Sequence, residues 1–374
     1  MGKKQCSNWV ILVILALLVH SLYAAEKKDT NKIQTYAVFQ NWNRYSFSDT
    51  EYEAEFRRLR AGLKGEPLSF LSYNVMFQYD RLGSRISSTS GFAPTFVNIS
   101  FYPFKNKAVF CVNTGYIWAG ITREFLTSPL TMAPLDKTPG ITFLRNFLTA
   151  KSNGIVPGTS INGSIQFPAL DIYYRSGIFF PEKFNTITSY SGPLQTAHLT
   201  FSFFDREREE NNSFTMKGVH FGRRNMLSVG MGASYAGSTK NWINSEDTIS
   251  FSRQYAYGVD GKAEIQNIEI TGEAFWLESG LSNSYFKGLE WSFQLSYKIF
   301  ITAERLFQPF LQLSGYRGKG LDYTVFRNNG SYFISGIVFW YTSSNALSIN
   351  YTWYKETINE IDDQALKLVL QVRF

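Results

Sequence analysis

The chain has 374 residues, of which 44% are hydrophobic and 17% are aromatic, and its formal net charge is +7. This modest charge does not indicate a nucleic-acid partner, and the two cysteines, Cys6 and Cys111, are too few for a secreted domain stapled by several disulfides. The 33 phenylalanines and 22 tyrosines favour either packed sheets or a lipid-facing barrel with aromatic girdles.

The N-terminus has the layout of a secretory signal peptide. Lys3 and Lys4 precede an apolar run from Trp9 to Val19, and Ala24 supplies a small residue at the expected cleavage site. The run is shorter than the ~20 residues that a membrane-spanning helix needs. We therefore expect residues 1–24 to be a signal peptide and residues 25–374 to be the exported domain, with an uncleaved N-terminal anchor as the alternative.

Long segments of the exported domain alternate apolar and polar residues. In the segment 289–298 every odd position is apolar or aromatic and every even position is polar or charged, and 71–80 and 347–353 follow nearly the same pattern. Alternate side chains of a strand point to opposite faces, so each segment predicts a strand with one apolar face. Such segments exceed the ~5–6 residues usual in globular proteins and approach the ~9–11 of a membrane-crossing strand.

Membrane-crossing strands must close into a barrel, because lipid offers no hydrogen-bond partners to the backbone. We therefore expect an all-β fold, a transmembrane antiparallel β-barrel of about 16 strands with a water-filled interior, or lumen. Short turns are expected at the periplasmic end and longer polar connections at the other. The segment 206–225 is too long for a turn, and we expect it to extend the flanking strands or to form a periplasmic flap. The expected strands are 33–47, 55–65, 71–81, 94–104, 109–120, 159–167, 171–180, 197–205, 226–237, 255–265, 268–279, 286–300, 306–317, 331–343, 346–356 and 364–374.

The second expected strand, 55–65, carries a row of basic residues. Because charges on the lipid-facing side of a barrel are costly, its apolar residues must face lipid, and Arg58, Arg60 and Lys64 are expected to line the lumen. The same parity puts Arg57 on the outer face near a rim, where a long side chain can snorkel. Rows of basic side chains favour anions in a pore. The alternative is ion pairing with acids of the lumen, such as Asp260, Glu269, Glu273 or Glu290.

The longest connection, 121–158, is the third on the extracellular side. It contains several prolines and large apolar residues, which an exposed floppy loop would not need. Long loops in compact domains are usually functional. We expect this loop to fold into the lumen and narrow it, with a lid over the mouth as the alternative. Its basic residues are further candidates for guiding anions: Arg123, Lys137, Arg145 and Lys151.

Two histidines remain in the exported domain, His198 and His220. A barrel hydrolase would need a nucleophile beside a histidine base. His198 has lumenal parity and His220 lies in the irregular segment 206–225, so we expect structural roles for both. No cysteine pair or histidine pair has ligand spacing, and we therefore expect no metal site, no cofactor and no catalytic site.

The C-terminal segment alternates as clearly as any other. Every second residue from Leu366 to Phe374 is apolar, and the other parity includes Lys367, Gln371 and Arg373. The final aromatic residue resembles the signal by which barrels of the bacterial outer membrane are recognised for assembly. We therefore expect an outer-membrane location, and periplasmic chaperones and the barrel-assembly machinery as partners during biogenesis.

Three segments resemble the porin O/P family of phosphate- and pyrophosphate-selective outer-membrane porins. They are FRRLRAGLKG at 56–65, HFGRRNMLSVG at 220–230 and ALKLVLQVRF at 365–374, within a diffuse likeness over the whole exported domain. The resemblance implies a sixteen-stranded barrel that assembles as a homotrimer, with the third loop folded inward and basic residues that guide anions. In that family, phosphate selectivity depends on lysines and an arginine ladder inside the pore.

Taken with the residues, the resemblance predicts a porin for passive diffusion of small hydrophilic solutes, with a preference for anions such as phosphate. Membrane lipid and small anions are then its partners, and no nucleic acid is expected. The alternatives are a non-conducting barrel that acts as an anchor or adhesin, and an outer-membrane hydrolase. Channel conductance distinguishes these three.

Overall fold

The computed structural model describes residues 33–82, 93–149, 151–181, 193–207, 216, 218–237, 239–242, 248–281, 285–319, 329–357 and 360–374. The predicted signal peptide, 1–24, lies outside these residues. None of the helices in the described ranges is both long enough and apolar enough to span a membrane.

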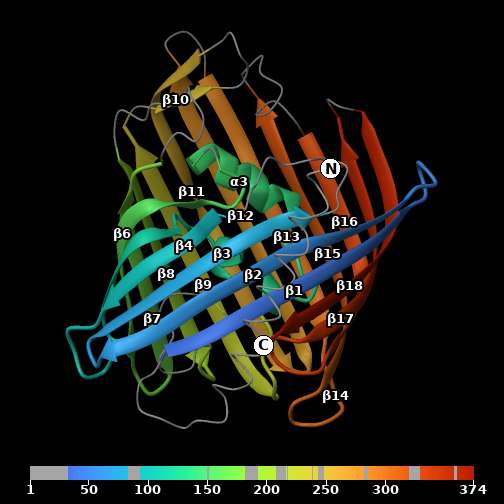
Figure 1. Cartoon of the computed structure of the whole chain (residues 1–374). Coiled ribbons are helices and arrows are strands. Elements are labelled where there is room, and N and C mark those ends of the chain that lie inside the picture. Colours follow the sequence, from blue (N-terminus) through green and yellow to red (C-terminus); the bar gives the residue numbers. More distant parts are fainter. Residues whose placement is uncertain are drawn as a thin grey trace, which may run out of the picture.

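The described chain is dominated by strands that follow one another around a ring (Figure 1). Two of the strands are short continuations of longer ones. β10 continues β9, because both pair with β11, and β14 continues β13, because both pair with β15. The 18 labelled strands therefore make 16 crossings. The strands are β1 (Ile33–Ser46), β2 (Tyr52–Leu68), β3 (Leu71–Leu82), β4 (Ala93–Phe101), β5 (Cys111–Trp118), β6 (Ile155–Gln166), β7 (Leu170–Phe179), β8 (Leu194–Phe204), β9 (Arg224–Ala236), β10 (Thr239–Trp242), β11 (Thr248–Gln266), β12 (Ile268–Leu281), β13 (Tyr285–Tyr297), β14 (Ile299–Phe300), β15 (Leu306–Lys319), β16 (Asn329–Trp340), β17 (Ala346–Glu356) and β18 (Ile361–Arg373).

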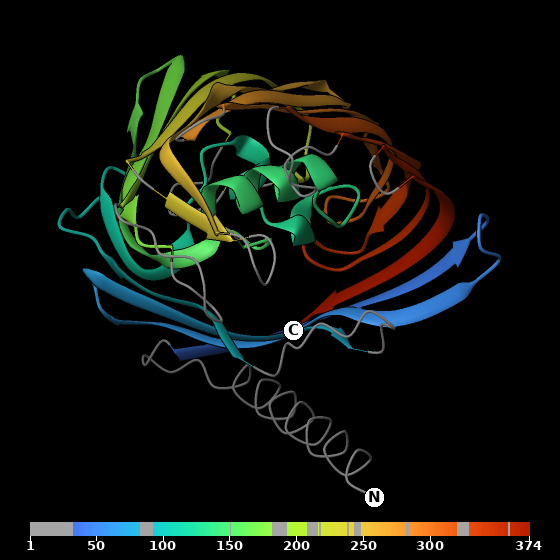
Figure 2. The ribbon, with the colours of Figure 1, turned by 90° about the horizontal axis from the view of Figure 1, so that it is seen from above.

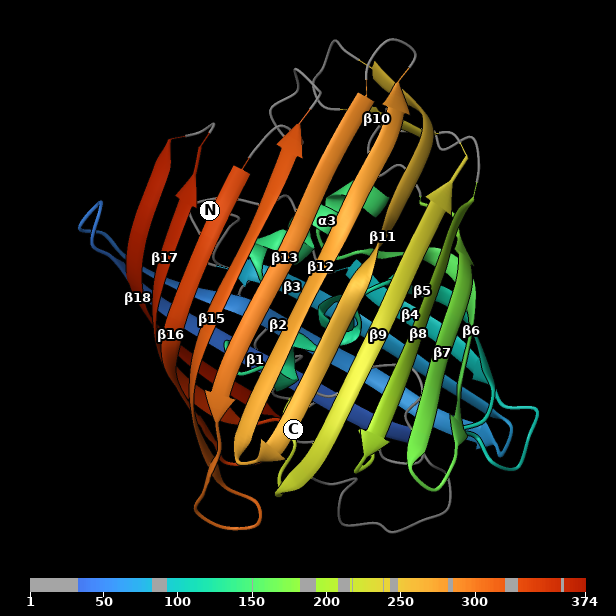
Figure 3. The same ribbon diagram turned by 180° about the vertical axis from the view of Figure 1, so that it is seen from behind.

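The first and last strands close the ring. β1 pairs with β18 from Val38↔Arg373 to Ser46↔Ala365, and it also pairs with β2. Every pairing between strands is antiparallel, and each of the 16 crossings pairs with the crossings before and after it in the chain (Figure 3). The expected fold, a closed antiparallel barrel of 16 strands, is confirmed, and each expected strand corresponds to one of the crossings.

Burial along the strands is inverted relative to a water-soluble protein. In β9 the odd-numbered apolar residues Leu227, Val229 and Met231 are exposed, whereas Ser228 and Ser234 are buried. Large apolar side chains are exposed in the same way on every side of the ring, and soluble monomers rarely expose apolar patches beyond a few hundred Å². The outer face is therefore suited to lipid, and the polar groups face inward.

One end of the ring is closed by tight turns. Backbone hydrogen bonds close the β6–β7, β14–β15 and β16–β17 turns, for example from Phe167 N to Leu170 O at 2.9 Å. The last residue lies at the same end, where Ala37 and Phe374 exchange two backbone hydrogen bonds. We call this the turn end and the opposite end the loop end.

The third connection of the loop end runs from β5 to β6 and contains three short helices. They are α2 (Arg123–Leu126), the 3₁₀ helix η1 (Pro129–Thr131) and α3 (Pro139–Thr149). Viewed along the barrel, these helices lie within the ring of strands (Figure 2). α3 packs against β13, β15 and β16.

A second segment enters the ring from the turn end. Its described residues are 205–207, 216 and 218–223, between β8 and β9. Met216 forms a parallel β-bridge with Thr127, and Gly218 N donates to Thr131 Oγ1 at 3.1 Å. The expectation that this segment extends its flanking strands is therefore wrong for residues 216 and 218, because they pair with the third connection inside the barrel.

The two entering segments share apolar contacts with the inner face of the wall. One buried cluster joins Ala133 and Leu135 of the third connection to Val219 and to inward residues of β15, β16 and β17. Another joins Phe143, Leu144 and Phe147 of α3 to Phe275 and Phe286. Burial of apolar surface is the dominant favourable term in folding, so these contacts hold the third connection inside the ring.

Candidate functional site: the lumenal wall and the third connection

One side of the inner wall is basic. We define the basic wall as Arg57, Arg58, Arg60 and Lys64 of β2 together with Lys367 and Arg373 of β18. The two strands flank β1, so these residues lie on three adjacent strands. The sequence predicts Arg58, Arg60 and Lys64 at this position, and the alternation of the C-terminal strand indicates that Lys367 and Arg373 face the lumen as well.

Arg57 faces inward, and its expected place on the outer face is wrong. The β1–β2 register shifts between Gln40, which pairs with Arg58, and Asn41, which pairs with Phe56. Arg57 is the extra residue of this bulge, and a bulge changes the direction in which side chains point. Its guanidinium lies 5.1 Å from the Trp42 ring centroid and 3.7 Å from an Asp136 carboxylate oxygen. Strict alternation could not reveal the bulge.

Arg58 is buried and contacts the third connection. It donates to Gln40 Oε1, to Leu135 O at 3.3 Å and to Asp136 Oδ1 at 2.5 Å. Burial alone would raise the pKa of Asp136, but the nearby positive charges of Arg57 and Arg58 outweigh it and lower that pKa. Arg58 therefore holds the loop to the wall, which is a structural use of a residue expected to line the pore.

Arg60 and Lys64 lie on either side of a tyrosine ring. Tyr36 of β1 is paired with Gly62 of β2, and a Cβ on Gly62 would lie 2.3 Å from the Tyr36 ring. The ring therefore covers Gly62, with Arg60 and Lys64 two residues away on each side of the same face. Arg373 lies 5.6 Å from the centre of that ring. Lys64 is exposed, and Arg60 and Arg373 are half-buried.

A groove separates the basic wall from the third connection. It measures about 280 Å³, and its lining includes Trp42 and Lys367 on one side and Pro134, Asp136 and Lys137 on the other. The Lys367 ammonium lies 4.8 Å from the Trp42 ring centroid, so one indole contacts both Lys367 and Arg57. Cations are attracted to the face of an aromatic ring without being neutralised by it.

The other predicted cations, those of the third connection, are mostly used internally. Lys137 donates to the carbonyls of Glu124 and Thr127, and burial lowers its pKa. Arg145 is buried, lies 4.6 Å above the Phe125 ring and donates to Phe125 O. Lys151 is partly exposed at the end of the loop. The structure does not bring these residues together with Arg60 and Lys64.

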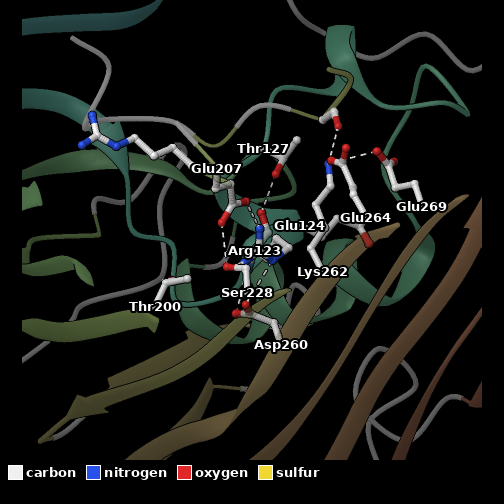
Figure 4. A network of polar contacts seen from close by, with 12 residues as sticks. Arg123, Glu124, Thr127, Thr200, Glu207, Ser228, Asp260, Lys262, Glu264 and Glu269 are labelled. Atoms are coloured by element: carbon white, nitrogen blue, oxygen red, sulfur yellow. Dashed lines mark hydrogen bonds and ion pairs between the residues drawn. The ribbon is translucent and has the colours of Figure 1, made fainter. Parts of the chain in front are cut away.

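Arg123 is the centre of a buried network that fixes the third connection to the far wall (Figure 4). It pairs with Glu207 and Asp260, and it donates to Ser228 Oγ at 2.8 Å. Its backbone N–H also donates to Asp260, at 3.1 Å. The network thus joins α2 to β9, β11 and the turn-end segment. Burial disfavours the charge of Arg123, but Glu207 and Asp260 raise its pKa.

His198 belongs to the same network. Its Nε2 lies 2.6 Å from Asp260 Oδ2, and its Nδ1 lies 3.4 Å from Thr200 Oγ1. A hydroxyl, an imidazole and a carboxylate in this order resemble a hydrolase triad. Thr200 is 0% exposed, however, so no substrate can reach its hydroxyl in this structure.

The acids that the sequence analysis considered as partners for the cations of β2 contact other residues instead. Glu269 pairs with Lys262 and Lys298, both of which also pair with Glu264 (Figure 4). Asp260 is held by Arg123 and His198. Arg58 does form an ion pair, which was the alternative to guiding anions, but its partner is Asp136 of the third connection.

The remaining two acids lie where the loop helices begin. Glu273 accepts from Thr122 Oγ1 and from Glu124 N, at 3.1 and 2.8 Å. Glu290 is 0% exposed beneath Gly140, and neither of its carboxylate oxygens has a hydrogen-bond partner among the described residues. These carboxylates lie on β12 and β13, across the ring from the basic wall.

A second cavity lies on this acidic and ion-paired side. It measures about 550 Å³ and is bounded by the third connection, by Gly218 and Val219, and by β11–β15. The cations in its lining, Arg123 and Lys262, are both in ion pairs. The described residues contain no group of three or more His, Cys, Asp or Glu side chains that could hold a metal ion.

Comparison with known proteins supports the fold. No family model matches the chain, and no curated protein matches it. Solved structures do. An anion-selective porin from Comamonas acidovorans has a TM-score of 0.60 at 12% identity and covers 92% of this chain and 100% of its own. Outer-membrane expressed OmpT of Vibrio cholerae has a TM-score of 0.57 at 11% identity, with 93% and 99% covered. Salmonella typhi OmpF in complex with daunomycin has a TM-score of 0.57 at 11% identity, with 92% and 99% covered. The chain therefore has the closed sixteen-stranded barrel fold of outer-membrane proteins that include porins.

Proposed function

We propose that the protein is an outer-membrane porin, a passive channel for small hydrophilic solutes with a preference for anions such as phosphate. Three features support a channel: the apolar outer face, the polar inner face and the likeness to porin structures. The preference for anions rests on the basic wall. No chemical reaction is part of this function.

The anion preference rests on three cations of the basic wall that have no acidic partner among the described residues. Lys64, Lys367 and Arg373 form no ion pair with any described residue. Across the ring, Arg123, Lys262 and Lys298 are neutralised by acids. Uncompensated positive charge therefore lies on the described parts of β2 and β18, and solutes passing between this wall and the third connection meet it. The third connection, held by apolar contacts, narrows that path.

Ion selectivity tests this proposal directly. In planar bilayers under a KCl gradient, we expect stepwise openings and a reversal potential of the sign that indicates chloride preference. Two charges about 7 Å apart in water interact by ~0.6 kcal/mol. The double variant Lys64→Gln, Lys367→Gln is therefore expected to lower the chloride preference roughly 2–3-fold per charge. Added phosphate should reduce the chloride conductance of the unaltered protein more than that of the variant.

Arg253→Gln is the matched control. Arg253 is an exposed cation of β11 that points outward, because its neighbour Gln254 is buried inside the barrel. Removing it should leave selectivity unchanged. Preference for potassium in the unaltered protein would remove the anion proposal and leave the channel.

The filled lumen favours one other candidate, a non-conducting barrel. Both entering segments bury apolar residues inside the ring, as a plug would. The same bilayer measurement decides between the two functions, because a plugged anchor or adhesin inserts without stepwise openings. Release of fatty acids or peptides by the purified protein would instead support a hydrolase.

A homotrimer is part of the proposal, because the family that the sequence resembles is trimeric. One of the similar structures, OmpT of Vibrio cholerae, is described as a trimer form. Native mass spectrometry of the protein in detergent tests the stoichiometry.

A further inference from the structure

The groove between the basic wall and the third connection is small and partly apolar. Its volume of about 280 Å³ includes space that is open to solvent, so it admits only a small ligand. Pro134 of the third connection, Ile334 of β16 and Val369 of β18 line it, and all three are buried. Moving a fully hydrated ion against apolar walls is costly, so these walls favour a ligand that has carbon atoms of its own.

Three polar groups of the same lining have no hydrogen-bond partner among the described residues. The indole N–H of Trp42 and the amide oxygen of Asn350 are both buried without one. Asn350 is 2% exposed, and its amide nitrogen donates to Ser348 Oγ at 2.9 Å. The ammonium of Lys367, 4.8 Å from the Trp42 ring centroid, is the third group. Buried polar groups nearly always have a partner, so a molecule bound in the groove is expected to supply it.

Strand pairing brings these groups next to one another. Asn350 of β17 is directly opposite Lys367 of β18, and Trp42 of β1 is directly opposite Val369. Residues directly opposite each other have Cβ atoms ~4.5–5.5 Å apart, and Lys367 and Val369 are ~7 Å apart on the same face of β18. Across three adjacent strands, two hydrogen-bond donors are therefore followed by one acceptor.

The charges around the groove favour an anion with a single negative charge. Arg57, Arg58 and Lys367 lie on the wall side, and Asp136 is the acid that the described lining contains. The excess of cations attracts an anion. The carboxylate of Asp136 stays in the same groove, however, and like charges at close range repel. A second negative charge on the ligand is therefore disfavoured.

We propose that the groove binds a small monovalent hydroxycarboxylate, such as lactate. The carboxylate of the ligand accepts from the Lys367 ammonium and from the Trp42 N–H, and its hydroxyl donates to the amide oxygen of Asn350. Its carbon atoms lie against Ile334 and Val369. As a class of solute for the channel, this ligand rests on the proposed porin function.

Saturation-transfer NMR of the purified protein in detergent measures this binding without requiring an open channel. We expect lactate to bind about tenfold more tightly than propionate, a difference equivalent to about 1.4 kcal/mol. Propionate has the same charge and the same number of carbon atoms but no hydroxyl. A site built to hydrogen-bond a hydroxyl rejects the analogue that lacks it, because the polar group of the site is then left unpaired.

Three variants assign the contacts. N350A should make lactate and propionate bind equally, whereas K367Q and W42F should weaken the binding of both acids severalfold. W42F removes the N–H and keeps an aromatic ring. N162A is the matched control, because Asn162 of β6 is also a buried asparagine of the inner wall but lies outside the groove. It should leave the preference for lactate unchanged.

Three results would overturn the proposal. Equal binding of lactate and propionate to the unaltered protein would exclude the contact with Asn350. Displacement of lactate by an equal concentration of inorganic phosphate would assign the groove to phosphate. Absence of any saturation transfer to lactate would mean that water alone fills the groove.

Bilayer recordings keep this test separate from that of the channel. Stepwise openings without lactate binding would remove the site and leave the channel. Lactate binding without openings would remove the channel and leave the site.

Discussion

The two sides of the inner wall carry similar residues and use them in opposite ways. On β2 and β18 several cations keep open positions beside a groove, whereas on the facing wall the cations Arg224, Lys262 and Lys298 are each paired with acids. The difference lies in the acids within reach, because Glu264 and Glu269 stand on the same wall as Lys262 and Lys298. We therefore expect a lumenal charge to contribute to selectivity only where neither a neighbouring strand nor an entering segment brings it a partner.

Removing the ion pairs of Arg123 should give the largest loss of stability. Arg123→Ala removes the guanidinium that pairs with the buried carboxylates of Glu207 and Asp260, and removing one partner of a buried ion pair typically costs about 3–5 kcal/mol. We expect a large loss of stability in urea unfolding and a third connection that no longer holds to β9 and β11. Arg206→Ala is the control, because the Arg206 side chain is 50% exposed where it pairs with Asp171. An Arg123→Ala protein as stable as the control would show that the apolar contacts alone hold the loop.

Asp136 of the third connection pairs with Arg57 and Arg58 of the basic wall, and low pH should weaken this attachment. The folded pKa of this loop carboxyl lies below its ordinary value of 3.8, because Arg57 and Arg58 favour its charged form. Its contribution to stability is therefore complete above about pH 4 and is lost as the pH falls further, through the folded pKa. We expect Asp136→Asn to cost roughly 1–2 kcal/mol at neutral pH. The difference between the two proteins should shrink as the pH is lowered from 4 toward 2, measured by unfolding midpoints at each pH. A constant difference over that range would rule out this role of the ion pair.

The basic wall can be disturbed by adding a side chain at Gly62, next to the Tyr36 ring. Gly62→Val should force the Tyr36 ring away from β2 at a cost of about 1–3 kcal/mol and move it between Arg60 and Lys64. Gly261→Val is the matched control, since the nearest atom to a Cβ there is 3.4 Å away. We expect lower thermal stability and altered single-channel conductance for the first variant, and little change for the second. Equal behaviour of the two would mean that the ring is not packed on Gly62.

Sequence periodicity predicted the barrel closely, for a physical reason. Lipid on one side and polar groups on the other impose a period of two on every strand, and this signal is local, as in the segments 289–298 and 366–374. Hence the number of crossings and the lumenal parity of Arg58, Arg60 and Lys64 follow from the residues. The same rule indicates Lys367 and Arg373. The rule failed at Arg57. One extra residue in β2, opposite β1, changes which side chains point inward, and the local sequence pattern does not reveal it.

The use of each charge could not be predicted in this way. Arg58, Arg123, Lys137 and Arg145 look much like Lys64 in the sequence. Arg58 and Arg123 are nevertheless tied to acids far away in the chain, and Lys137 and Arg145 to carbonyls of their own connection. The turn-end segment that reaches Thr127 from Met216 likewise carries no periodic signal.

By itself, the sequence determined that the chain closes into a barrel, which faces of its strands meet lipid and where its basic residues point, because these depend on neighbours two residues apart. The tertiary structure alone decided which of the lumenal charges are neutralised. The pairs of Arg58 and Arg123 join side chains that separate segments bring within a few ångströms, and such an interaction has no counterpart in the spacing along the chain.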